Sequence, residues 1–397
     1  MTNKTASMTN SIAVINAGSS SIKFAIYEAG SAHSCLFRGQ IEGIGVKPHF
    51  KVADAAGAVV EERSFETQSF DHAAATREII TTGRTLLKGE SVIAFGHRVV
   101  HGGLDYAAPV RVTEAVLDDL AKLEPLAPLH QPHNLAPIRT IMKAAPQIPQ
   151  IACFDTAFHR TQSNLAQAFA LPRRFAEEGV RRYGFHGLSY EFLASRLKEI
   201  APQLASGRIV FAHLGNGASL CAVKDGRSVA ATMGFTAVDG LMMGTRCGAV
   251  DPGVILYMMQ RHGMDAAAIE DLVYKRSGLL GVSGISSDMR ALRGSSDPAA
   301  QEAIALFVYR IVRELGSLVA ALGGLDGLVF SGGIGEHDAT TRAEVVAGSR
   351  WTGASLEPAR NEGGEGLISA DDSTVAVWVI PTDEERLIAR QTAEQLH

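Results

Sequence analysis

Two stretches far apart in the chain share one plan: a β-rich run, a turn of small polar residues, and a second β-rich run. The first, VINAGSSSIKFAIYE, spans residues 14–28, and the second, IVFAHLGNGASLCAVKDGR, spans residues 209–227. A repeated unit of this kind predicts a duplicated architecture, in which each half of the chain offers one loop to a shared cleft. We therefore expect the chain to contain two copies of one structural unit.

Strand-like runs alternate with helical stretches along the chain, which predicts an α/β protein. The clearest helix spans residues 298–322, after Asp297 and before Gly323. Its apolar residues recur every three or four positions, a stripe that suits either a core or a subunit interface. The proline-rich residues 125–149 instead predict a constrained loop. The predicted strands are residues 12–15, 22–27, 150–154, 209–213, 220–223, 327–330 and 374–380.

Composition excludes several classes of protein. A length of 397 residues predicts two domains. The formal net charge of -5 argues against nucleic acid or an anionic membrane as a partner, because both attract clustered basic residues. The four cysteines lack CxxC spacing, which argues against a zinc site or a disulfide framework. Neither a signal peptide nor a membrane span is recognisable, so we expect a cytoplasmic protein.

The turns of the two repeated hairpins are suited to hold phosphate. Successive backbone N–H groups in a Gly/Ser turn form an anion site, and small side chains let a phosphate approach closely. In the first turn Gly18 permits the bend, Ser19 and Ser21 offer hydroxyls, and Lys23 supplies a charge. A serine-rich hairpin with a surface lysine is the alternative interpretation of this turn alone. The second turn, HLGNGAS, favours the phosphate interpretation, because two such loops can grip one polyphosphate.

A third segment, VFSGGIGEH, places Gly332, Gly333 and Gly335 directly after an apolar strand at residues 327–330. We expect a turn at these glycines, where the backbone must approach something flat or charged. No Walker loop, dinucleotide-binding GxGxxG, HExxH or GxSxG motif is present. A P-loop enzyme, a Rossmann dehydrogenase, a zinc protease and an α/β-hydrolase are therefore disfavoured.

Nine segments, taken in order, resemble the acetate kinase family of short-chain acyl kinases. They are NAGSSSIK, GHRVVHGG, PLHQPHN, FDTAFH, RRYGFHGLSY, HLGNGAS, MGFTAVDGLMMGTRCG, SGGIGEH and PTDEE. The resemblance implies two duplicated ribonuclease H-like domains of the actin-like ATPase superfamily, with a nucleotide cleft between them. The first domain would comprise residues 1–156 completed by 381–397. The second, residues 157–380, would bind nucleotide and contribute to a homodimer.

The resemblance implies reversible transfer of a phosphoryl group from ATP to acetate, giving acetyl phosphate and ADP. A carboxylate is already ionised at neutral pH, so the difficulty is electrostatic and cations must offset the charge of two anions. By resemblance Arg98 holds the incoming carboxylate, while His186 and Arg246 donate to the transferring group. Asp155 matches the catalytic aspartate of the family. We interpret it as orienting Arg98 or metal-bound water, with an acid/base role as the alternative.

Magnesium, with manganese as an alternative, is the implied metal, and Glu384 resembles the glutamate associated with it. Asn16 would assist through water, and Glu385 is the rival carboxylate. His337 stands where family members usually have asparagine, which leaves the nucleotide preference open. The nucleotide contacts implied by resemblance are Lys23, Ser19, Ser21, His213, Leu214, Gly215, Asn216, Gly217, Asp288, Met289, Arg290, Gly333, Ile334, Gly335, Glu336 and His337.

A small apolar pocket sets the size of the substrate, and by resemblance Val100, Leu129, Phe185 and Ala237 line it. Family members commonly have proline at the position of Ala237, so propionate is a credible second substrate. Two rival functions are a kinase of the same superfamily that acts on a sugar hydroxyl, and a nucleotide-driven chaperone or filament protein. The apolar pocket argues against the first, and the lack of a large extra segment argues against the second.

Overall fold

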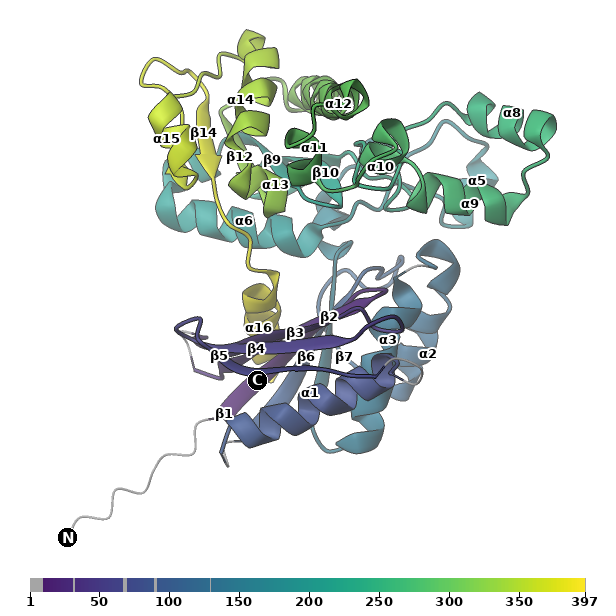
Figure 1. Cartoon of the computed structure of the whole chain (residues 1–397), viewed down its shortest axis with the longest axis vertical. Helices are drawn as coiled ribbons and strands as arrows, with labels where there is room; N and C mark the ends of the chain where they lie inside the picture. The colour runs from purple at the N-terminus through teal and green to yellow at the C-terminus, as the bar shows by residue number, and fades with distance from the viewer. Residues whose placement is uncertain (1–9, 31–32, 67–69, 89–90, 129, 397) are drawn as a thin grey trace. The chain divides into compact units, whose positions relative to one another are not determined.

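The computed structural model (Figure 1) describes residues 10–30, 33–66, 70–88, 91–128 and 130–396. The chain divides into two compact units. Unit 1 consists of two segments of the chain, one that ends at Ala157 and one that begins at Asp383. Unit 2 spans Phe158–Thr382. The assignment of nucleotide binding and dimerisation to the second domain stays a prediction.

Unit 1 is built on a mixed sheet with the strand order β5-β4-β3-β2-β1-β6-β8-β7. The central strand β1 pairs antiparallel with β2 and parallel with β6, and β6 pairs parallel with β8. The strands are β1 (Asn10–Ala17), β2 (Ser21–Glu28), β3 (Cys35–Glu42), β4 (His49–Asp54), β5 (Val59–Ser64), β6 (Ser91–Val99), β7 (Val110–Arg111) and β8 (Gln150–Phe154). The helices are α1 (His72–Leu86), α2 (Glu114–Ala121), α3 (Gln131–Ala144) and α16 (Glu384–Glu394), with a 3-10 turn at Glu124–Leu126.

Helices cover both faces of this sheet. Phe95 packs with residues of α1 and α3 in one core cluster. The next residue, Gly96, faces α16, where an added Cβ would lie 2.6 Å from Ile388. Because successive strand residues point to opposite faces, α16 lies on the face opposite α1 and α3. The C-terminal helix is therefore part of the core of unit 1.

Unit 2 repeats the plan around a sheet of order β11-β10-β9-β12-β14-β13. Here β9 pairs antiparallel with β10 and parallel with β12, and β12 pairs parallel with β14. The strands are β9 (Arg208–Leu214), β10 (Ala218–Lys224), β11 (Arg227–Ala231), β12 (Gly327–Ser331), β13 (Gly366–Leu367) and β14 (Ala376–Val379). Its helices are α4 (Asn164–Gln167), α5 (Arg173–Glu177), α6 (Gly187–Ile200), α7 (Pro202–Ala205), α8 (Pro252–His262), α9 (Ala266–Lys275), α10 (Gly278–Ser283), α11 (Met289–Arg293), α12 (Pro298–Leu322), α13 (Gly332–His337), α14 (Ala339–Gly348) and α15 (Pro358–Gly363), with 3-10 turns at Ala157–Thr161 and Arg350–Thr352.

The two sheets confirm the duplication predicted from the repeated hairpins. In each, the first three strands pair antiparallel and two parallel strands lie on the other side of the first strand, in the order of a ribonuclease H-like domain. Unit 1 extends its antiparallel side by β4 and β5. The first repeat forms the β1–β2 hairpin and the second forms the β9–β10 hairpin. The α/β class and the duplicated fold are therefore as expected.

The long helix predicted after Asp297 is α12, and both of its ends match the prediction. The Asp297 side chain accepts a hydrogen bond from the backbone N–H of Ala299, and Gly323 ends the helix with φ 71°. The apolar stripe, including Ile304 and Phe307, is buried against the rest of its own unit. Of the two interpretations left open for this stripe, a core or a subunit interface, the structure supports the core.

The prediction of a loop over residues 125–149 was wrong. Most of that segment is helix α3, with one proline in its first turn and Pro137 in its interior. Pro137 lacks an N–H group and removes one bond of the helix ladder. Leu135, Ile138 and Ile141 are at most 1% exposed, and this burial stabilises the helix despite the prolines. Within the described ranges, no helix is long and apolar enough to cross a membrane.

Candidate active site

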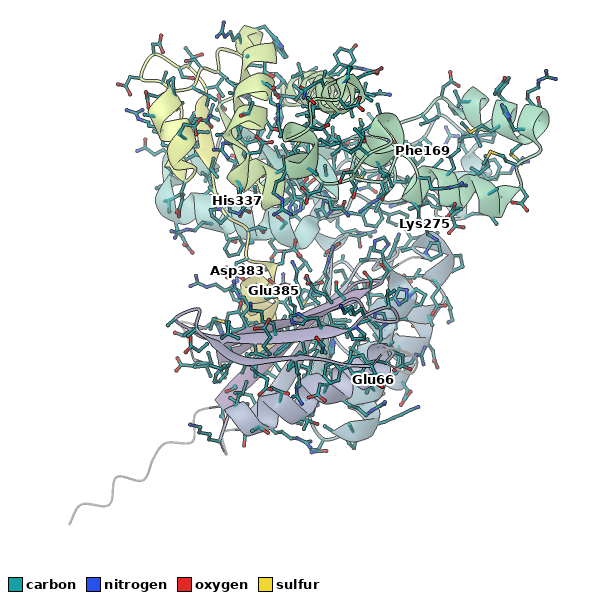
Figure 2. All side chains as sticks on the ribbon, in the orientation of Figure 1. Glu66, Phe169, Lys275, His337, Asp383 and Glu385 are labelled. Carbon is teal, nitrogen blue, oxygen red and sulfur yellow. The ribbon has the colours of Figure 1, made fainter. Side chains whose placement is uncertain are left out.

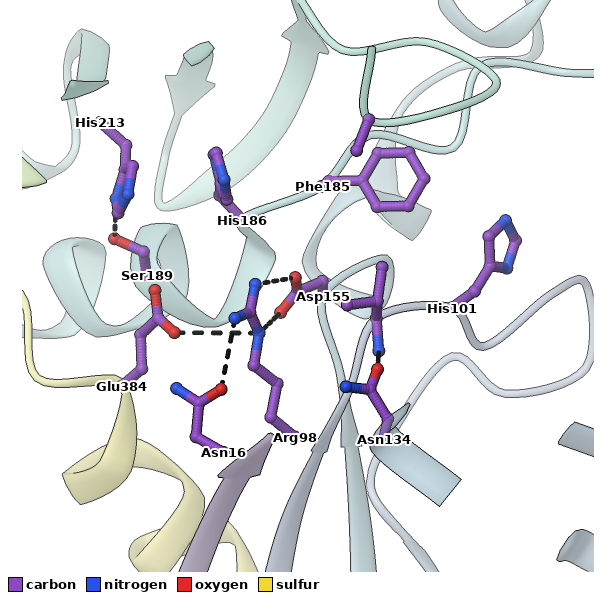
Figure 3. Close-up of polar contacts among 12 residues, drawn as sticks. Asn16, Arg98, His101, Asn134, Asp155, Phe185, His186, Ser189, His213 and Glu384 are labelled. Atoms are coloured by element: carbon purple, nitrogen blue, oxygen red, sulfur yellow. Dashed lines mark hydrogen bonds and ion pairs between the residues drawn. The ribbon is translucent and has the colours of Figure 1, made fainter. Parts of the chain in front are cut away.

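Three neighbouring strands of unit 1 bring polar side chains to one edge of the sheet (Figure 3). Asn16 lies near the end of β1, Arg98 near the end of β6, and Asp155 directly after β8. Because these strands are parallel, their carboxyl ends meet at the same edge, where ligands of open α/β sheets bind. The sheet therefore brings Arg98 together with residues that are 57 and 82 positions away in sequence.

Arg98 and Asp155 form a bidentate ion pair. Arg98 Nε donates to Asp155 Oδ1 at 3.0 Å, and Nη2 donates to Oδ2 at 2.6 Å. The Asp155 side chain is 1% exposed, whereas that of Arg98 is 22% exposed. Burial alone would lower the pKa of Arg98, but the Asp155 and Glu384 carboxylates raise it above the ordinary value. The guanidinium is therefore a fixed cation in a fixed orientation.

Arg98 keeps donors for a further ligand. A guanidinium has five N–H groups. Two bind Asp155, and one on Nη1 donates to Asn16 Oδ1 at 3.3 Å. The pair with Asp155 uses the Nε side of the guanidinium fork, so the outer edge formed by Nη1 and Nη2 is the side that suits a second carboxylate.

Glu384 begins helix α16 and lies beside the same arginine. Its Oε2 is 3.9 Å from Arg98 Nε, and the neighbouring Glu385 accepts a hydrogen bond of 3.1 Å from Asn16 Nδ2. Burial raises the pKa of Glu384, and Asp155 and Glu385 raise it further against the opposing effect of Arg98. A nearby cation stabilises the ionised form of such a buried carboxylate.

These oxygen atoms fit a hard divalent cation. Such an ion takes one or two carboxylates and fills its remaining positions with water and phosphate oxygens. The Glu384 carboxylate is of the kind that such an ion takes, whereas the Asn16 amide oxygen already accepts a hydrogen bond from Arg98. Across the part of the chain that the structure describes, no group of three or more His, Cys, Asp or Glu side chains is arranged to hold a metal alone.

The β1–β2 turn carries the predicted phosphate-facing residues of unit 1. Lys23 is the cross-strand partner of Asn16, so both side chains lie on the same face of the hairpin. Gly18 N–H donates to the carbonyl of Ser21 at 2.8 Å, and Ser19 is exposed. His72 Nε2 lies 2.7 Å from the carbonyl oxygen of Gly18. Sequence reasoning missed this support from α1, because nothing in the sequence relates His72 to the turn.

The β9–β10 turn in unit 2 holds the second predicted loop, Leu214–Gly217. His186 and Arg246 both approach this turn: a Cβ on Gly217 would lie 2.9 Å from Arg246 Nη2 and 3.3 Å from His186 Nε2. The His213 ring lies 4.4 Å from the His186 ring, centroid to centroid. Gly215 and Asn216 complete the turn, and the Asn216 carbonyl accepts a hydrogen bond of 3.0 Å from Gly244 N–H. Unit 2 therefore gathers two predicted catalytic residues at its glycine loop.

His186 is held in a strained position at the start of α6. Its φ of 56° lies in the left-handed region, which is uncommon for a residue with a side chain. The buried His159 contacts the preceding carbonyl, because its Nε2 lies 2.9 Å from Phe185 O. Its Nδ1 lies 2.9 Å from Ser228 Oγ. We assigned no role to His159 from sequence, although it ends the FDTAFH motif.

The third glycine segment forms helix α13 rather than the turn we predicted. Gly332, with φ 76°, starts it where a Cβ would lie 2.8 Å from the Leu214 carbonyl oxygen. The Glu336 carboxylate accepts from Gly332 N–H at 2.8 Å, and Gly335 is buried. Gly333 is exposed and Ile334 is half-buried. His337 is also exposed (Figure 2). The helix adds N–H groups pointing along its axis, a feature that a plain turn lacks.

Two further groups of predicted residues occupy different environments. Asp288 caps α11 and pairs with Arg290, whose side chain is 91% exposed, whereas Met289 is buried. The residues predicted to line the substrate pocket are divided between the two units. Val100 belongs to unit 1, and Phe185 and Ala237 belong to unit 2. Val100 N–H donates to Asn134 Oδ1, and the Ala237 carbonyl accepts from Arg246 Nη1 at 2.6 Å. Leu129 lies outside the described residues.

Comparison with known proteins identifies the family. A model of the acetokinase family matches residues 11–390. The chain belongs to the acetokinase family. The acetate kinase of Rhodopseudomonas palustris is 54% identical over 389 residues, which cover 96% of this chain and 98% of the relative. An ATP-dependent kinase that needs a divalent metal ion is the activity this membership implies.

Solved structures agree with the fold of this family member. The crystal structure of acetate kinase from Porphyromonas gingivalis has a TM-score of 0.88 at 39% identity, covering 98% of this chain and 100% of that one. A propionate kinase from Francisella tularensis has a TM-score of 0.90 at 32% identity, covering 97% of this chain and 99% of that one. The duplicated fold and the enzyme class are therefore established over nearly the full length of the chain.

Proposed function

We propose that this acetokinase transfers the γ-phosphoryl group of ATP directly to acetate, reversibly and with Mg²⁺, giving acetyl phosphate and ADP. The observation that carries the proposal is the Arg98 guanidinium, which Asp155 holds from the Nε side. Its outer edge offers two N–H groups to a planar carboxylate, the geometry that arginine provides and lysine cannot. A sugar hydroxyl would need a base in place of this cation.

The carboxylate substrate decides what Asp155 does. Acetate is ionised at neutral pH, so it needs no general base to become a nucleophile. Asp155 already accepts two hydrogen bonds from Arg98, which supports a role in orienting that arginine. Its nearly complete burial makes the bond strong, because few water molecules compete for it.

His186 and Arg246 are proposed to stabilise the transferring phosphoryl group. In such a transfer negative charge spreads over three equatorial oxygens, and donors fixed in advance lower the barrier. Both side chains approach Gly217 from their own elements, so one group seated at this turn can receive hydrogen bonds from both. The proposed contacts with the nucleotide phosphates are the backbone of the β9–β10 turn, the start of α13, and Lys23.

Mg²⁺ is the proposed metal, with Mn²⁺ as an alternative ion. When bound, it would offset negative charge on the phosphate chain. Glu384 would hold the ion and Asn16 would assist through water, while Glu385 keeps the Asn16 amide oriented through its own hydrogen bond. The raised pKa of Glu384 supports this assignment, because a cation offsets the cost of burying its charge.

Propionate is the second candidate substrate. Ala237 is a small residue, and the fold is similar to that of a propionate kinase. One methylene in an apolar pocket discriminates by only about 1–3 kcal/mol, so a modest widening is enough to admit it. Action on small acids with ATP is consistent with a cytoplasmic enzyme that binds neither nucleic acid nor membrane.

A homodimer is proposed through the hairpin of α8 and α9 rather than through α12, whose stripe is buried. No residue of either helix is buried, and Val254, Leu256, Tyr257 and Met259 are between 40% and 57% exposed. Such a group of large apolar side chains is typical of a protein interface. Another copy of the same chain is the partner expected from the resemblance.

One assay separates the proposed function from its rivals. The purified protein is incubated with Mg-ATP and either acetate, propionate, butyrate or glycerol, and acyl phosphate is trapped with hydroxylamine. We expect strong hydroxamate formation with acetate and weaker formation with propionate. ADP release with glycerol but no hydroxamate would indicate an alcohol kinase. ATP hydrolysis that ignores every acceptor would indicate a switch ATPase.

A further inference from the structure

We propose that Asn134 is a positioning residue that fixes the spacing between the carboxyl ends of β1 and β6. The end of β1 carries Asn16 and leads into the phosphate-facing turn, and the end of β6 carries Arg98. Asn134 acts on the backbone of both strands rather than on a substrate. The consequence for catalysis rests on the proposed functions of Asn16 and Arg98, whereas the hydrogen bonds of Asn134 are a property of the resting protein.

Asn134 joins the two strands through its side-chain amide (Figure 3). Its Oδ1 accepts a hydrogen bond of 2.9 Å from the Val100 N–H, and its Nδ2 donates to the Ala17 carbonyl at 2.6 Å. The partners fix which end of the amide is which, because a backbone N–H only donates and a carbonyl oxygen only accepts. All three residues are buried, so bulk water does not compete for either bond. We call this pair of hydrogen bonds the Asn134 clamp.

The Asn134 clamp lies where the backbone pairing of the two strands stops. The last parallel pair of β1 and β6 is Ile15 with His97, and Asn16 and Arg98 are the next residues along each strand. Beyond that pair the Asn134 amide connects the two backbones in place of the ladder. Arg98 Nη1 and Asn16 Oδ1 meet across the same gap at 3.3 Å, so the spacing of the strand ends sets this contact as well.

Asn134 supports the strands from the face opposite the groups that we assign to ligands. It belongs to α3, whereas Glu384 begins α16 and lies beside Arg98. Helices α3 and α16 cover opposite faces of this sheet, as the neighbours of Phe95 and Gly96 show. A change at Asn134 can therefore shift both strand ends without removing any group proposed to bind a substrate or the metal.

Asn134→Leu removes both hydrogen bonds and keeps an apolar side chain of the same branching. We expect kcat to fall about 10- to 100-fold, because a misplacement of about 1 Å between reacting groups costs about that much. The KM values for acetate and ATP should each change by less than about threefold, since each ligand still meets its own groups. The stoichiometry of nucleotide binding counts the folded sites, so that unfolded protein is not mistaken for a lower kcat.

Asn134→Asp gives a pH profile that a merely structural role would not produce. A protonated carboxyl group offers one acceptor and one O–H donor, as the amide does, whereas the ionised form has no donor for the Ala17 carbonyl. Because burial raises the pKa of such a carboxyl group, the ratio of variant to wild-type kcat should rise about tenfold as pH falls from about 8 to about 6. The same ratio for Asn134→Leu should stay flat.

Taking the ratio to wild type removes the effect of titratable neighbours. These are His72 in the first turn of α1, His133 in α3 and His101 after β6, and all three are present in both proteins. Gln150→Leu is the matched control, because Gln150 is also buried and its Nε2 donates to the Ile138 carbonyl of α3 at 3.3 Å. Gln150 starts β8, at the end of that strand away from Asp155, so the variant should lower Tm and leave kcat within about twofold.

Hydrogen exchange of the Val100 amide tests the clamp without turnover. In the full chain labelled with ¹⁵N-valine, this N–H should exchange slowly in the wild type and at least about tenfold faster in Asn134→Leu. Val100→Ile identifies the signal by its loss.

A wild-type kcat or an unchanged Val100 exchange rate in Asn134→Leu would overturn the proposal, and so would a flat kcat ratio in Asn134→Asp. If Asn134→Leu does not fold, the pH profile of Asn134→Asp decides. The proposed function fails separately. If the wild-type protein forms no hydroxamate from acetate, the reaction is a different one, whereas slow exchange of Val100 would still support the clamp.

Discussion

Asp155 holds Arg98 by two parallel hydrogen bonds, and the two residues stand at the ends of neighbouring parallel strands. The strand pairing sets their separation, and the burial of Asp155 keeps water from competing. This relationship fixes the orientation of the Arg98 side chain, which we propose binds the carboxylate substrate. It also gives Asp155 a role, the orientation of Arg98, in a proposed reaction that needs no general base.

Asp155→Asn should therefore disable use of the carboxylate substrate more than nucleotide binding. The variant loses one charged acceptor, and hydrogen bonds to charged groups contribute about 1.5–3 kcal/mol, so kcat/KM for acetate should fall about 10- to 100-fold. Steady-state kinetics with acetate and titration with ATP analogues measure the two effects. The matched control is Asp326→Asn, which breaks the surface pair of Arg208 and Asp326 with its similar geometry. Full acetate turnover by Asp155→Asn would contradict the orienting role.

Glu384→Gln should weaken metal dependence and stabilise the metal-free protein. Because burial raises the pKa of Glu384, its ionised form destabilises the fold at neutral pH, and a neutral amide removes that cost. We expect an equal or higher Tm without metal. We also expect a smaller rise in Tm on adding Mg²⁺ with nucleotide, and about a tenfold higher Mg²⁺ requirement. Thermal unfolding with and without Mg-ADP is the measurement. An unchanged response to Mg²⁺ would rule out Glu384 as a ligand.

Acid should destabilise unit 1 through His97. Burial lowers the pKa of this histidine to about 4, below its ordinary value of 6.5. The unfolded chain therefore binds the proton first, and stability is lost as pH falls from about 6.5 toward 4, by up to about 3 kcal/mol. His97→Leu should reduce the dependence of Tm on pH in this window, and the remainder should come from His101, whose pKa burial also lowers to about 4. An unchanged dependence of Tm on pH in His97→Leu would contradict this role of His97.

Gly217→Ala should lower kcat more than it raises KM for ATP. The added Cβ would lie within 3.3 Å of both Arg246 and His186, so one of these side chains must move. A displacement of a donor at the transferring group costs transition-state stabilisation, which corresponds to a loss of about 10- to 100-fold in kcat. Gly363→Ala, where nothing lies within 4 Å of the new Cβ, is the control for folding. Equal kcat in both variants would argue against convergence of the two donors at this turn.

The α8–α9 hairpin can be tested as the subunit interface. Leu256→Asp places a charge on a helix whose large apolar residues are exposed, and a charge buried in an interface is strongly unfavourable. We expect a monomer in light scattering after gel filtration, against a dimer for the wild-type chain. Leu165→Asp, at an exposed leucine outside the hairpin, should stay dimeric. A dimer in both variants would move the interface elsewhere.

Local sequence was enough to predict much of the fold. Both ends of α12 follow from Asp297 and Gly323, because capping depends on a few adjacent residues. Strand β8 matches its predicted bounds at residues 150–154, since a short apolar run between turn residues has few alternatives. The repeated hairpins likewise predicted the duplication, and the ordered motifs predicted the family that the comparisons established.

Tertiary structure decided what local sequence could not. Helix α3 forms over prolines that predict a loop, because burial of its apolar face outweighs the lost backbone bond. His72, Asn134 and His159 support the site from positions up to 117 residues away from the groups they touch. Propensity and capping act over a few residues, whereas hydrogen bonds between distant elements exist only once the sheets have formed. The sequence by itself therefore determined the fold class, the repeat and the family, and the tertiary structure decided which distant side chains contact the predicted site residues.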